Sequence, residues 1–401
     1  MKPDEYLARL KSATWLFRDD TQQLLDVLDG NAGRTRAVGG VVRDTLLERP
    51  REHADIDFAT ELLPREVSLR IEGAGGTVYP TGIEHGTVTL RLGALVAEVT
   101  TLREDVETDG RRAVVRFGTD WARDAGRRDF TLNALYADAD GELFDPLGGL
   151  DDCIAGRIRF IGDPRRRIEE DRLRVYRFFR FSASHGGERY DPEGLAACAA
   201  WAGKLDTVSA ERVGGEFRRM LSLPRVANTF GMMTEAGILT LSEETIRLLQ
   251  VYERRARRPD ASARLALIMA ETGNRQLKEL WRLSNDDVES AQAILTVAEL
   301  ARDFRLNEAA YRHPAALADG VEIAAVIAGW TDAGRSAVME ELQSLDVPRF
   351  PVRGEDLVRL GLKPGKALGN ELERLEQLWI ESGFTLNRAE LLEKAGGASD
   401  A

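Results

Sequence analysis

Hydrophobic residues recur at two different spacings along the first hundred residues. Over residues 1–30 they follow helix spacing, as in Tyr6, Leu7 and Leu10. Further on they fall into short runs bounded by glycine, which predicts a helix at 64–72 and strands at 36–42, 54–59, 76–79, 86–92 and 95–101. The first part of the chain is therefore expected to form a small domain of helices around a mixed sheet.

Helix spacing takes over in the second half of the chain. The apolar positions there predict helices at 205–221, 264–273, 276–282, 285–304, 322–329, 335–345 and 368–380. Ahead of them, residues 102–118 are polar and mixed in charge around Asp109 and Gly110, as expected of a loop or a ribbon. The pattern thus predicts an α+β chain whose first domain ends at 150–163 and is followed by helices.

The composition is that of a globular protein with more than one domain. At 401 residues the chain exceeds the roughly 250–300 residues at which single hydrophobic cores stop growing. Its apolar stretches are far shorter than the ~20 residues that span a bilayer, and its charged N-terminus lacks the apolar region of a secretory signal. The two cysteines, Cys153 and Cys198, stand apart. These features predict a cytoplasmic protein with reduced thiols and no membrane partner.

The candidate chemistry begins with two glycines and two aspartates. Gly39 and Gly40 carry no Cβ, so their N–H groups could approach a triphosphate closely. In the next strand Asp55 and Asp57 are two residues apart and project from the same face. Paired carboxylates are hard oxygen ligands of the kind that Mg²⁺ combines with phosphate oxygens and water. Each pair alone is more often a turn or a solvated strand, but together they indicate nucleotidyl transfer with Mg²⁺.

A third carboxylate, Glu98, lies between apolar neighbours in the last predicted strand of this domain. If that strand pairs with 54–59, Glu98 lies near the metal or acts as a base for an incoming hydroxyl. The alternative is a strand residue that faces solvent.

A second cluster of polar residues follows at 127–133. Arg127 and Arg128 could bind a triphosphate bidentately, because a guanidinium fork matches phosphate oxygens. Asp129 and Asn133 are four residues apart, so on a helix they would face the same side. There they could hold an arginine or a ribose hydroxyl.

Arginines are concentrated in one segment although the net charge of the chain is −12. Residues 157–180 contain nine arginines against four acids, which suggests a confined phosphate site or else a solvated helix. The residues from 167 to 181 are predicted to form one helix, on which one face carries, at every third position, Asp171, Arg174, Arg177 and Arg180.

Asp171 and Arg174 would place a hydrogen-bond acceptor beside a donor. Cytosine and adenine each present an amino donor next to a ring acceptor, which this pair complements, whereas guanine and uracil reverse the pattern. Each buried mismatch costs ~1–3 kcal/mol, so two could reject the wrong base by roughly 10²–10⁴. The alternative is an ordinary helix salt bridge to Arg174 from Glu170 or Asp171.

In this order the residues resemble the class II CCA-adding tRNA nucleotidyltransferase and bacterial poly(A) polymerase family of the polymerase-β superfamily. The matching pieces are Gly39-Gly40-x-Val42-Arg43-Asp44 with Asp55-x-Asp57, Arg127-Arg128-Asp129-Phe130-Thr131-x-Asn133-Ala134, Asp145-Pro146 through Gly149, Glu170-Asp171-x-x-Arg174-x-x-Arg177, and Glu211-Arg212 with Glu216. Five motifs in register make the resemblance specific.

The resemblance implies four regions. Residues 1–150 would be a polymerase-β-like catalytic head and 151–225 a helical neck that recognises the nucleotide and its base. A helical body would cover 226–340, and a helical tail that binds tRNA would cover 341–401.

The resemblance also implies roles for the motif residues. Asp55 and Asp57 would hold Mg²⁺, Asp171 and Arg174 would select the base, and the nucleotide would be bound by Gly40, Arg43, Arg128, Arg177 and Arg180. The activity implied is the addition of C, C and A to the tRNA 3′ end from CTP and ATP, without a nucleic-acid template and with release of pyrophosphate.

Neighbouring activities stay open at this point. A poly(A) polymerase is one alternative, although residues 82–89 look like the CCA-adding form. A CC-adding enzyme is another, although the segment 102–118 has the full length expected for addition of the final A. A catalytically dead RNA-binding protein would have lost the carboxylates, and a small-molecule nucleotidyltransferase would not need the long helical region. The oligomeric state is left open.

Overall fold

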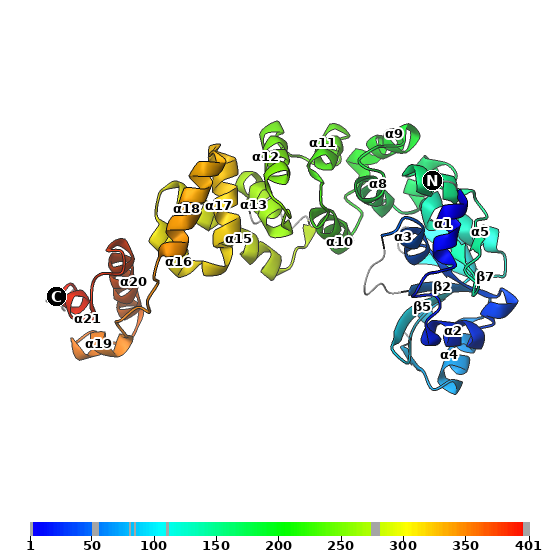
Figure 1. Ribbon diagram of the computed structural model, residues 1–401, viewed down its shortest axis with the longest axis horizontal. Helices are drawn as coiled ribbons and strands as arrows, with labels where there is room; N and C mark the ends of the chain where they lie inside the picture. Colours follow the sequence, from blue (N-terminus) through cyan, green and yellow to red (C-terminus); the bar gives the residue numbers. More distant parts are fainter. Residues whose placement is uncertain are drawn as a thin grey trace. The chain divides into compact units, whose positions relative to one another are not determined.

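The computed structural model describes residues 3–49, 56–79, 82–83, 86–109, 112–273 and 281–395, with the backbone alone over 104–109 and 112–115. The chain divides into two compact units, Met1–Glu216 with Met232–Thr240, and Phe217–Gly231 with Leu241–Ala401. All the strands described lie in the first unit, and helices follow in both (Figure 1). The predicted α+β class is confirmed, whereas the division into four regions stays a prediction.

The elements up to the end of the neck region are, in chain order, α1 (Pro3–Leu10), α2 (Asp19–Val27), η1 (Gly30–Ala32), β1 (Thr35–Val38), α3 (Gly40–Leu46), β2 (Ile56–Thr60), α4 (Pro64–Gly73), β3 (Thr77–Tyr79), β4 (Thr87–Leu92), β5 (Leu95–Thr101), β6 (Arg103–Asp109), β7 (Arg112–Phe117), α5 (Trp121–Gly126), η3 (Thr131–Asn133), β8 (Tyr136–Ala137), β9 (Leu143–Phe144), α6 (Gly149–Ala155), α7 (Pro164–Glu170), α8 (Leu173–Ser184), α9 (Pro192–Trp201), η4 (Ala202–Lys204), α10 (Ala210–Leu221) and α11 (Ala227–Glu235).

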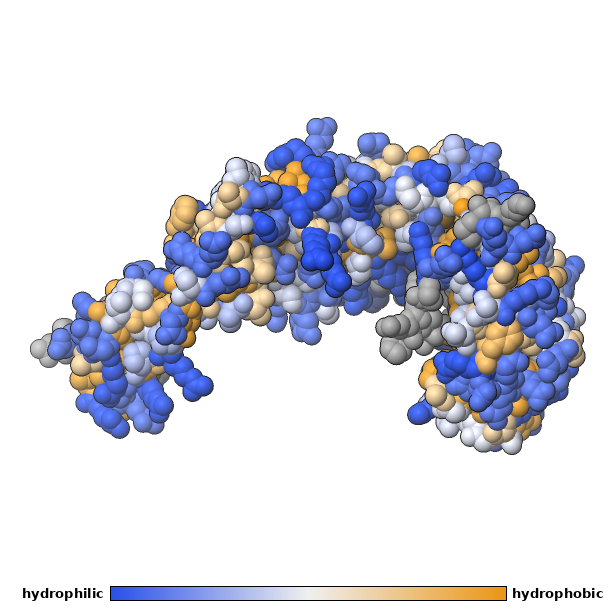
Figure 2. Space-filling view, in the orientation of Figure 1, coloured by the Kyte–Doolittle hydropathy of each residue, from blue (hydrophilic) through white to orange (hydrophobic). Residues whose placement is uncertain are grey.

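The remaining elements are α12 (Glu243–Arg255), α13 (Ala261–Thr272), α15 (Asn285–Arg302), α16 (Leu306–Arg312), η5 (Pro314–Ala316), α17 (Leu317–Ala328), α18 (Asp332–Ser344), α19 (Gly354–Arg359), α20 (Lys366–Glu381) and α21 (Arg388–Glu393). In the part of the chain that the structure describes, none of the helices has the length and apolar character needed to cross a bilayer. Hydrophilic side chains cover much of the visible face of both units (Figure 2).

The main sheet has seven strands in the order β3-β4-β5-β2-β1-β8-β9. Strands β2 and β5 run parallel, and the other neighbours are antiparallel. In β5 every second residue is buried, because successive side chains of a strand point to opposite faces. Helix α4 packs against β3, β4 and β5, and its own Val67 and Ile71 are buried. One face of this part of the sheet is thus covered, and Glu98 and Thr100 of β5 point to the other face.

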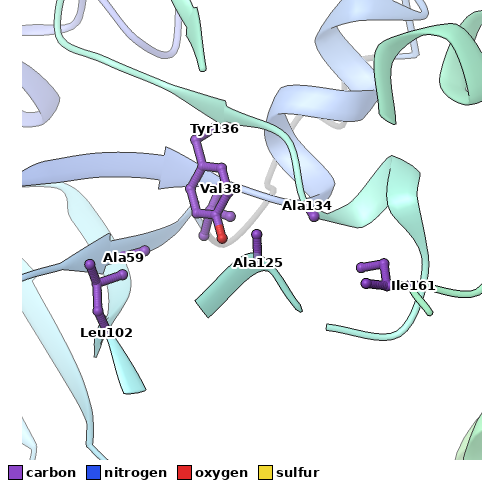
Figure 3. Close-up of a cluster of buried hydrophobic side chains, with 7 residues drawn as sticks. All are labelled: Val38, Ala59, Leu102, Ala125, Ala134, Tyr136 and Ile161. Carbon is purple, nitrogen blue, oxygen red and sulfur yellow. The ribbon is translucent and has the colours of Figure 1, made fainter. Parts of the chain in front are cut away.

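A compact apolar cluster lies where β1, β2 and β8 meet α5, formed by Val38, Ala59, Leu102, Ala125, Ala134, Tyr136 and Ile161 (Figure 3). The ring of Tyr136 crosses this cluster with its hydroxyl directed toward α5, where it donates to Asp124 at 3.0 Å. Trp121 packs edge-on against the same ring, with centroids 5.4 Å apart. The cluster fixes α5 against the sheet and so fixes the segment that follows it.

Most of the predicted strands and helices agree with the structure, although the helix predicted at 205–221 begins only at Ala210. The strand predicted at 36–42 is wrong beyond Val38, because Gly39 has φ 74° and ψ −119° and helix α3 begins at Gly40. The segment 102–118 is a ribbon, the antiparallel pair β6–β7. The helix predicted at 276–282 lies almost wholly outside the described residues. Both cysteines are free and buried, as predicted for core thiols.

The second unit contains a fully buried arginine. Arg264 on α13 has a side chain that is 0% exposed and donates to Leu221 O at 2.5 Å and Pro224 O at 2.9 Å. It also lies 2.8 Å from Glu253 of α12, whose carboxylate accepts from the backbone of Val226 at 2.9 Å. The guanidinium therefore joins the end of α10 to α12 and α13.

We expect Arg264→Met to lower the free energy of unfolding by about 3–5 kcal/mol, because it leaves Glu253 and two carbonyl oxygens buried without this donor. Denaturant unfolding of the purified protein measures the change. Arg247→Met is the matched control, because Arg247 pairs with Glu244 on α12 at side-chain exposures of 57% and 60%, and should change the free energy by less than about 0.5 kcal/mol. Equal midpoints for the two variants would contradict the structural role of Arg264.

Candidate active site

The glycine turn joins β1 to α3. Gly39 has a positive φ of 74°, which favours glycine, and its N–H donates to Leu135 O at 3.0 Å. A Cβ at Gly39 would lie 3.6 Å from Asn133 O and 3.8 Å from the Arg128 guanidinium. Residues from two distant segments therefore meet at this turn, and Gly40 begins the helix that carries Arg43.

Two of the three predicted carboxylates lie side by side. Asp57 of β2 is in register with Glu98 of the parallel strand β5, and both are exposed on the same face of the sheet. Neighbouring strands lie about 4.8 Å apart, so these carboxylates share one local site. The predicted pairing of the two strands is confirmed, and two hard oxygen donors in one place suit a cation such as Mg²⁺. Asp55 lies outside the described residues, so the pair Asp55–Asp57 is not described.

The glycine turn lies at the same end of the sheet as Asp57. Strands β1 and β2 are antiparallel, with Ala37 opposite Phe58, so β1 ends where β2 begins. Among the described residues no group of three acidic, histidine or cysteine side chains is close enough to hold a metal ion. The carboxylate pair and the turn are therefore neighbours in the sheet, and Asp55, the other predicted metal ligand, lies outside the described residues.

Asp129 is the centre of the second cluster. Its side chain is 8% exposed and accepts from the Asn133 amide at 2.9 Å, from the Phe130 N–H at 2.9 Å, and from Arg177 of α8 at 2.5 and 2.7 Å. Burial by itself would raise the pKa of Asp129, but Arg177 and Asn133 lower it by more. The carboxylate is thus held ionised, and the expectation that Asp129 could hold an arginine is met by Arg177.

The geometry of this segment differs from the predicted helix. Asn133 lies in the 3₁₀ turn η3 and Asp129 precedes it, so the two are not on one α-helix. They meet because the turn brings the amide of Asn133 back to the carboxylate. The other side of the same amide accepts from Arg43 Nη1 at 2.5 Å. Asn133 therefore links the glycine-turn helix to Asp129.

Arg127 and Arg128 share the carboxylate of Asp124, which was not among the predicted site residues. Asp124 is 1% exposed and lies 2.8 Å from Arg127 and 3.2 Å from Arg128, which also donates to the Tyr136 hydroxyl at 3.2 Å. Burial raises the pKa of Tyr136 to about 12, so this hydroxyl stays protonated. The signal that could have found Asp124 is its position three and four residues before the two arginines.

The predicted helix over 167–181 is wrong at Asp171. Helix α7 ends at Glu170, Asp171 is extended with φ −151° and ψ 103°, and α8 begins at Leu173. The carboxylate of Asp171 accepts from the Leu173 N–H at 3.1 Å, a side-chain to backbone bond that competes with continued helix. Asp171 therefore precedes the helix that carries Arg174, Arg177 and Arg180.

The two proposed base-selecting residues each have an oppositely charged partner. Asp171 accepts from Arg212 of α10 at 2.7 Å, while Arg174 donates to Glu170 at 2.8 Å and to Arg127 O at 3.1 Å. The helix salt bridge between Glu170 and Arg174 that was considered as an alternative is thus present. The last contact holds the Arg174 guanidinium beside the backbone of Arg127, whose own side chain is paired with Asp124.

Arg177 and Arg180 converge on a second buried acid. Glu216 of α10 is 1% exposed, forms an ion pair with Arg180 and lies 3.8 Å from Arg177. The ring of Phe181 lies 4.1 Å from the Arg180 guanidinium and 5.4 Å from that of Arg177. The arginine face of α8 is therefore packed against acids and an aromatic ring, as a buried positive cluster requires.

The structure thus brings the predicted site residues together in two linked groups, with a pair of carboxylates on the adjoining strands. The first group contains Gly39, Gly40, Arg43, Arg128, Asp129, Asn133, Arg177 and Arg180, and the second contains Arg127, Asp171 and Arg174. Asp57 and Glu98 lie on the adjoining strands.

Profiles of two protein families match the chain. The Poly A polymerase head domain matches residues 35–159, and the probable RNA and SrmB-binding site of polymerase A matches residues 190–242. The glycine turn, the carboxylate strands and the Arg127–Asn133 segment all lie inside the first match. Fold and site together define a nucleotidyltransferase with a head of the poly(A) polymerase type.

Individual relatives extend over nearly the whole chain. The mitochondrial CCA tRNA nucleotidyltransferase 1 of Danio rerio is 32% identical, over 94% of this chain and 90% of its own. The CCA-adding enzyme of Limosilactobacillus fermentum is 31% identical, over 90% and 92%. The solved structure of the Bacillus stearothermophilus CCA-adding enzyme in complex with CTP is 27% identical, with a TM-score of 0.76 over 94% of this chain and 98% of the other. The chain belongs to the family of CCA-adding tRNA nucleotidyltransferases, as its motifs predicted.

We expect Asp129→Asn to lower the free energy of unfolding by about 2 kcal/mol at pH 7, because Arg177 loses a charged hydrogen-bond partner. The pKa of Asp129 is lowered in the folded protein, so its stabilisation is complete above the ordinary value of 3.8 and is lost as the pH falls below that value. The difference between wild type and variant, measured by denaturant unfolding, should stay constant from pH 7 to 5 and shrink below pH 4.

Asp120→Asn is the control for this measurement. Asp120 caps α5 and lies 3.4 Å from the exposed Arg123, and asparagine caps a helix as well as aspartate does. Its unfolding should match wild type. A difference for Asp129→Asn that grows as the pH falls would contradict the ion pair with Arg177.

Proposed function

We propose that this enzyme adds C, C and A to the 3′ end of tRNA, using CTP and ATP without a nucleic-acid template and releasing pyrophosphate. The carrying observation is the identity of 31–32% to relatives named for this reaction, over at least nine-tenths of the chain. The CTP complex of the Bacillus stearothermophilus enzyme supports a nucleotide site in this fold. The tRNA 3′ hydroxyl attacks the α-phosphorus, and the bond to pyrophosphate breaks.

Nucleotidyl transfer in this family generally uses a divalent metal ion. We assign this ion as Mg²⁺ and its ligands as Asp55 and Asp57, because carboxylate oxygens are the donors that this chain offers here. The bound ion supplies positive charge to the oxygens of the reacting phosphate. Glu98, in register with Asp57, is proposed to orient the incoming hydroxyl or to take its proton.

The nucleotide is proposed to lie against the first group of the site. The Gly39 N–H is already bonded to Leu135 O, so Gly39 is proposed to shape the turn. The triphosphate is proposed to be bound by the Gly40 N–H at the start of α3 and by the guanidinia of Arg43, Arg127 and Arg128. Asp129 and Asn133 hold Arg177 and Arg43, so their role is to set the geometry of the cations as well as to contact the sugar. Arg177 and Arg180 complete the nucleotide-binding face.

Asp171 and Arg174 are proposed to read the base. Asp171 accepts a hydrogen bond from the amino group of cytosine or adenine, and Arg174 donates to the adjacent ring nitrogen. Arg212 and Glu170 restrain the two side chains from their other sides. Because each reading group keeps a charged partner, neither rotates freely to meet the reversed pattern of guanine or uracil.

The RNA partner is proposed to be tRNA, bound in part by the helical tail 341–401. The antiparallel ribbon β6–β7 extends over Arg103–Phe117, the length expected of an enzyme that completes the final A. This favours complete CCA addition over a CC-adding enzyme. We propose the cytoplasm as the site of action.

A tRNA that ends at its discriminator base tests the proposal. With Mg²⁺ and both CTP and ATP, we expect two C and one A to be added and extension then to stop, as read on a gel that resolves single nucleotides. Asp57→Asn should reduce the rate by roughly 10³-fold or more, since an ion ligand worth several kcal/mol in the transition state is lost.

Other outcomes have definite meanings. Arrest after two C with ATP present would make this a CC-adding enzyme, and an A ladder would make it a poly(A) polymerase. Unchanged activity in Asp57→Asn would contradict the assignment of the metal ligand. Asp140→Asn, a change at an exposed loop residue, should act as wild type in the same assay.

A further inference from the structure

A buried histidine lies at the C-terminal end of α8, and it has no role in the proposed chemistry. His185 is the C-cap residue of α8 and its side chain is 6% exposed. Its Nε2 lies 3.0 Å from Asp44 Oδ1 on α3, and its Nδ1 lies 2.7 Å from the Ser184 hydroxyl. The same end of α8 accepts from Arg49 through Ser184 O at 2.5 Å. The imidazole therefore joins α8 to the helix that follows the glycine turn.

The hydrogen bonds define the protonation of the ring. Ser184 has a hydroxyl hydrogen to donate to Nδ1, and the Asp44 carboxylate accepts the proton on Nε2, so the neutral imidazole satisfies both neighbours. The pKa of His185 is lowered, first by burial and then by Arg43 and Arg49, while Asp44 opposes the shift. Burial raises the pKa of Asp44, but His185 and Arg43 outweigh this and lower it to about 2. A neutral ring thus faces a charged carboxylate.

The other charged or titratable groups near this contact leave His185 neutral and Asp44 ionised. Arg189 donates to Gly186 O at 3.1 Å and to Ala155 O at 2.9 Å. Cys153 of α6 is buried beside Asp44 and Arg43, and burial raises its pKa to about 12. The thiol is therefore neutral, and Asp44 is the acid that faces the histidine.

Asp44 needs an anchor outside its own helix. It follows Arg43 directly, and side chains at adjacent helix positions do not face each other. Nevertheless Arg43 Nε donates to Asp44 Oδ1 at 2.8 Å, and this is the same oxygen that His185 contacts. His185 therefore holds the Asp44 carboxylate on the side of α8, and this carboxylate in turn holds the guanidinium of Arg43.

These contacts complete a closed ring of side chains. It starts at His185, passes through Asp44 and Arg43 to Asn133, continues to Asp129, and returns to α8 at Arg177. Both ends of the ring lie on α8, eight residues apart in the sequence. Arg43 is thus fixed from two sides, by Asn133 and by the pair Asp44–His185.

We infer that His185 is a positioning residue that, through Asp44, holds the Arg43 guanidinium in place for the triphosphate of the incoming nucleotide. The inference rests on the proposed function for the role of Arg43. His185 contacts no nucleotide atom in this account, and it is not a nucleophilic dyad with Ser184, because its ring is buried and its Nε2 is directed to a carboxylate.

The test compares two amide substitutions of equal polarity. The amide nitrogen of glutamine reaches about as far from the backbone as Nε2, whereas that of asparagine stops near Nδ1. His185→Asn should therefore raise KM for CTP and for ATP about tenfold, the loss of one hydrogen bond to a charged group, and change kcat less than about twofold. His185→Gln should restore KM to within about twofold of wild type.

A double-mutant cycle separates positioning from general loosening of the fold. In an Arg43→Met background, His185→Asn should have no further effect on KM, because the group that it positions is gone. A merely structural role would lower the melting temperature and activity of both backgrounds equally. His313→Asn is the matched control, another helix C-cap histidine, in the second unit, and should leave KM unchanged.

The outcomes distinguish the inference from the proposed function. If wild type does not extend tRNA, the proposed function fails. If wild type is active and His185→Asn and His185→Gln have equal KM values, or the effect persists in Arg43→Met, the inference fails. Should His185→Asn not fold, Asp44→Asn serves in the same cycle. This variant keeps the shape of the side chain at position 44 but removes the negative charge that faces Arg43, and its own rise in KM should likewise vanish in Arg43→Met.

Discussion

The ion pair between Asp129 and Arg177 is the contact on which the rest of the site depends. A carboxylate that is 8% exposed is costly to bury unless it is paired and fully hydrogen-bonded. Here it receives two bonds from Arg177, one from Asn133 and one from the backbone of Phe130. The pair crosses from the segment after α5 to helix α8, so it couples the loop beside the glycine turn to the helix that carries Arg174. Phe130, whose N–H donates to Asp129, packs against Phe160 and Phe181 with centroids 4.8 and 5.5 Å apart, which anchors this segment in the core.

The arginines of the site are largely balanced by acids from other elements. Asp124 holds Arg127 and Arg128, Glu170 holds Arg174, and Glu216 holds Arg180. The concentration of arginines is thus compatible with a net charge of −12 for the chain. Each acid occupies part of a guanidinium fork, so other N–H groups are left for the proposed binding of phosphate. Arginine suits this double use better than lysine, because its five donors point in fixed directions.

Much of the fold followed from local patterns, and much of the site did not. The short apolar run bounded by glycine predicted the strand Leu95–Thr101, and the expectation that it lies beside the strand of Asp57 is confirmed. The register that places Asp57 opposite Glu98 comes from the structure. The strand predicted through Val42 was wrong because the apolar run continues past Gly39, where a positive φ turns the chain into α3. The helix predicted across Asp171 was wrong because its side chain bonds to the Leu173 N–H instead.

The partners of the arginines could not be read from sequence for a different reason. Asp44, Asn133 and His185 lie far apart in the chain, and only the folded arrangement brings His185 to Asp44 over 141 positions. A motif marks which residues a site uses, but the acid opposite each arginine depends on how helices pack. Asp44, Asp124 and Glu170 are exceptions, since each lies within four residues of the arginine that it pairs with.

Asp171 and Arg174, held by Arg212 and Glu170, are proposed to select the base before any chemistry occurs. Equilibrium binding of CTP, ATP, GTP and UTP to the protein without tRNA measures this directly, for wild type and for Asp171→Ala with Arg174→Ala. Wild type should bind CTP and ATP at least ~10²-fold more tightly than GTP and UTP, and the double variant should bind all four nucleotides alike. Full discrimination retained by the double variant would contradict it.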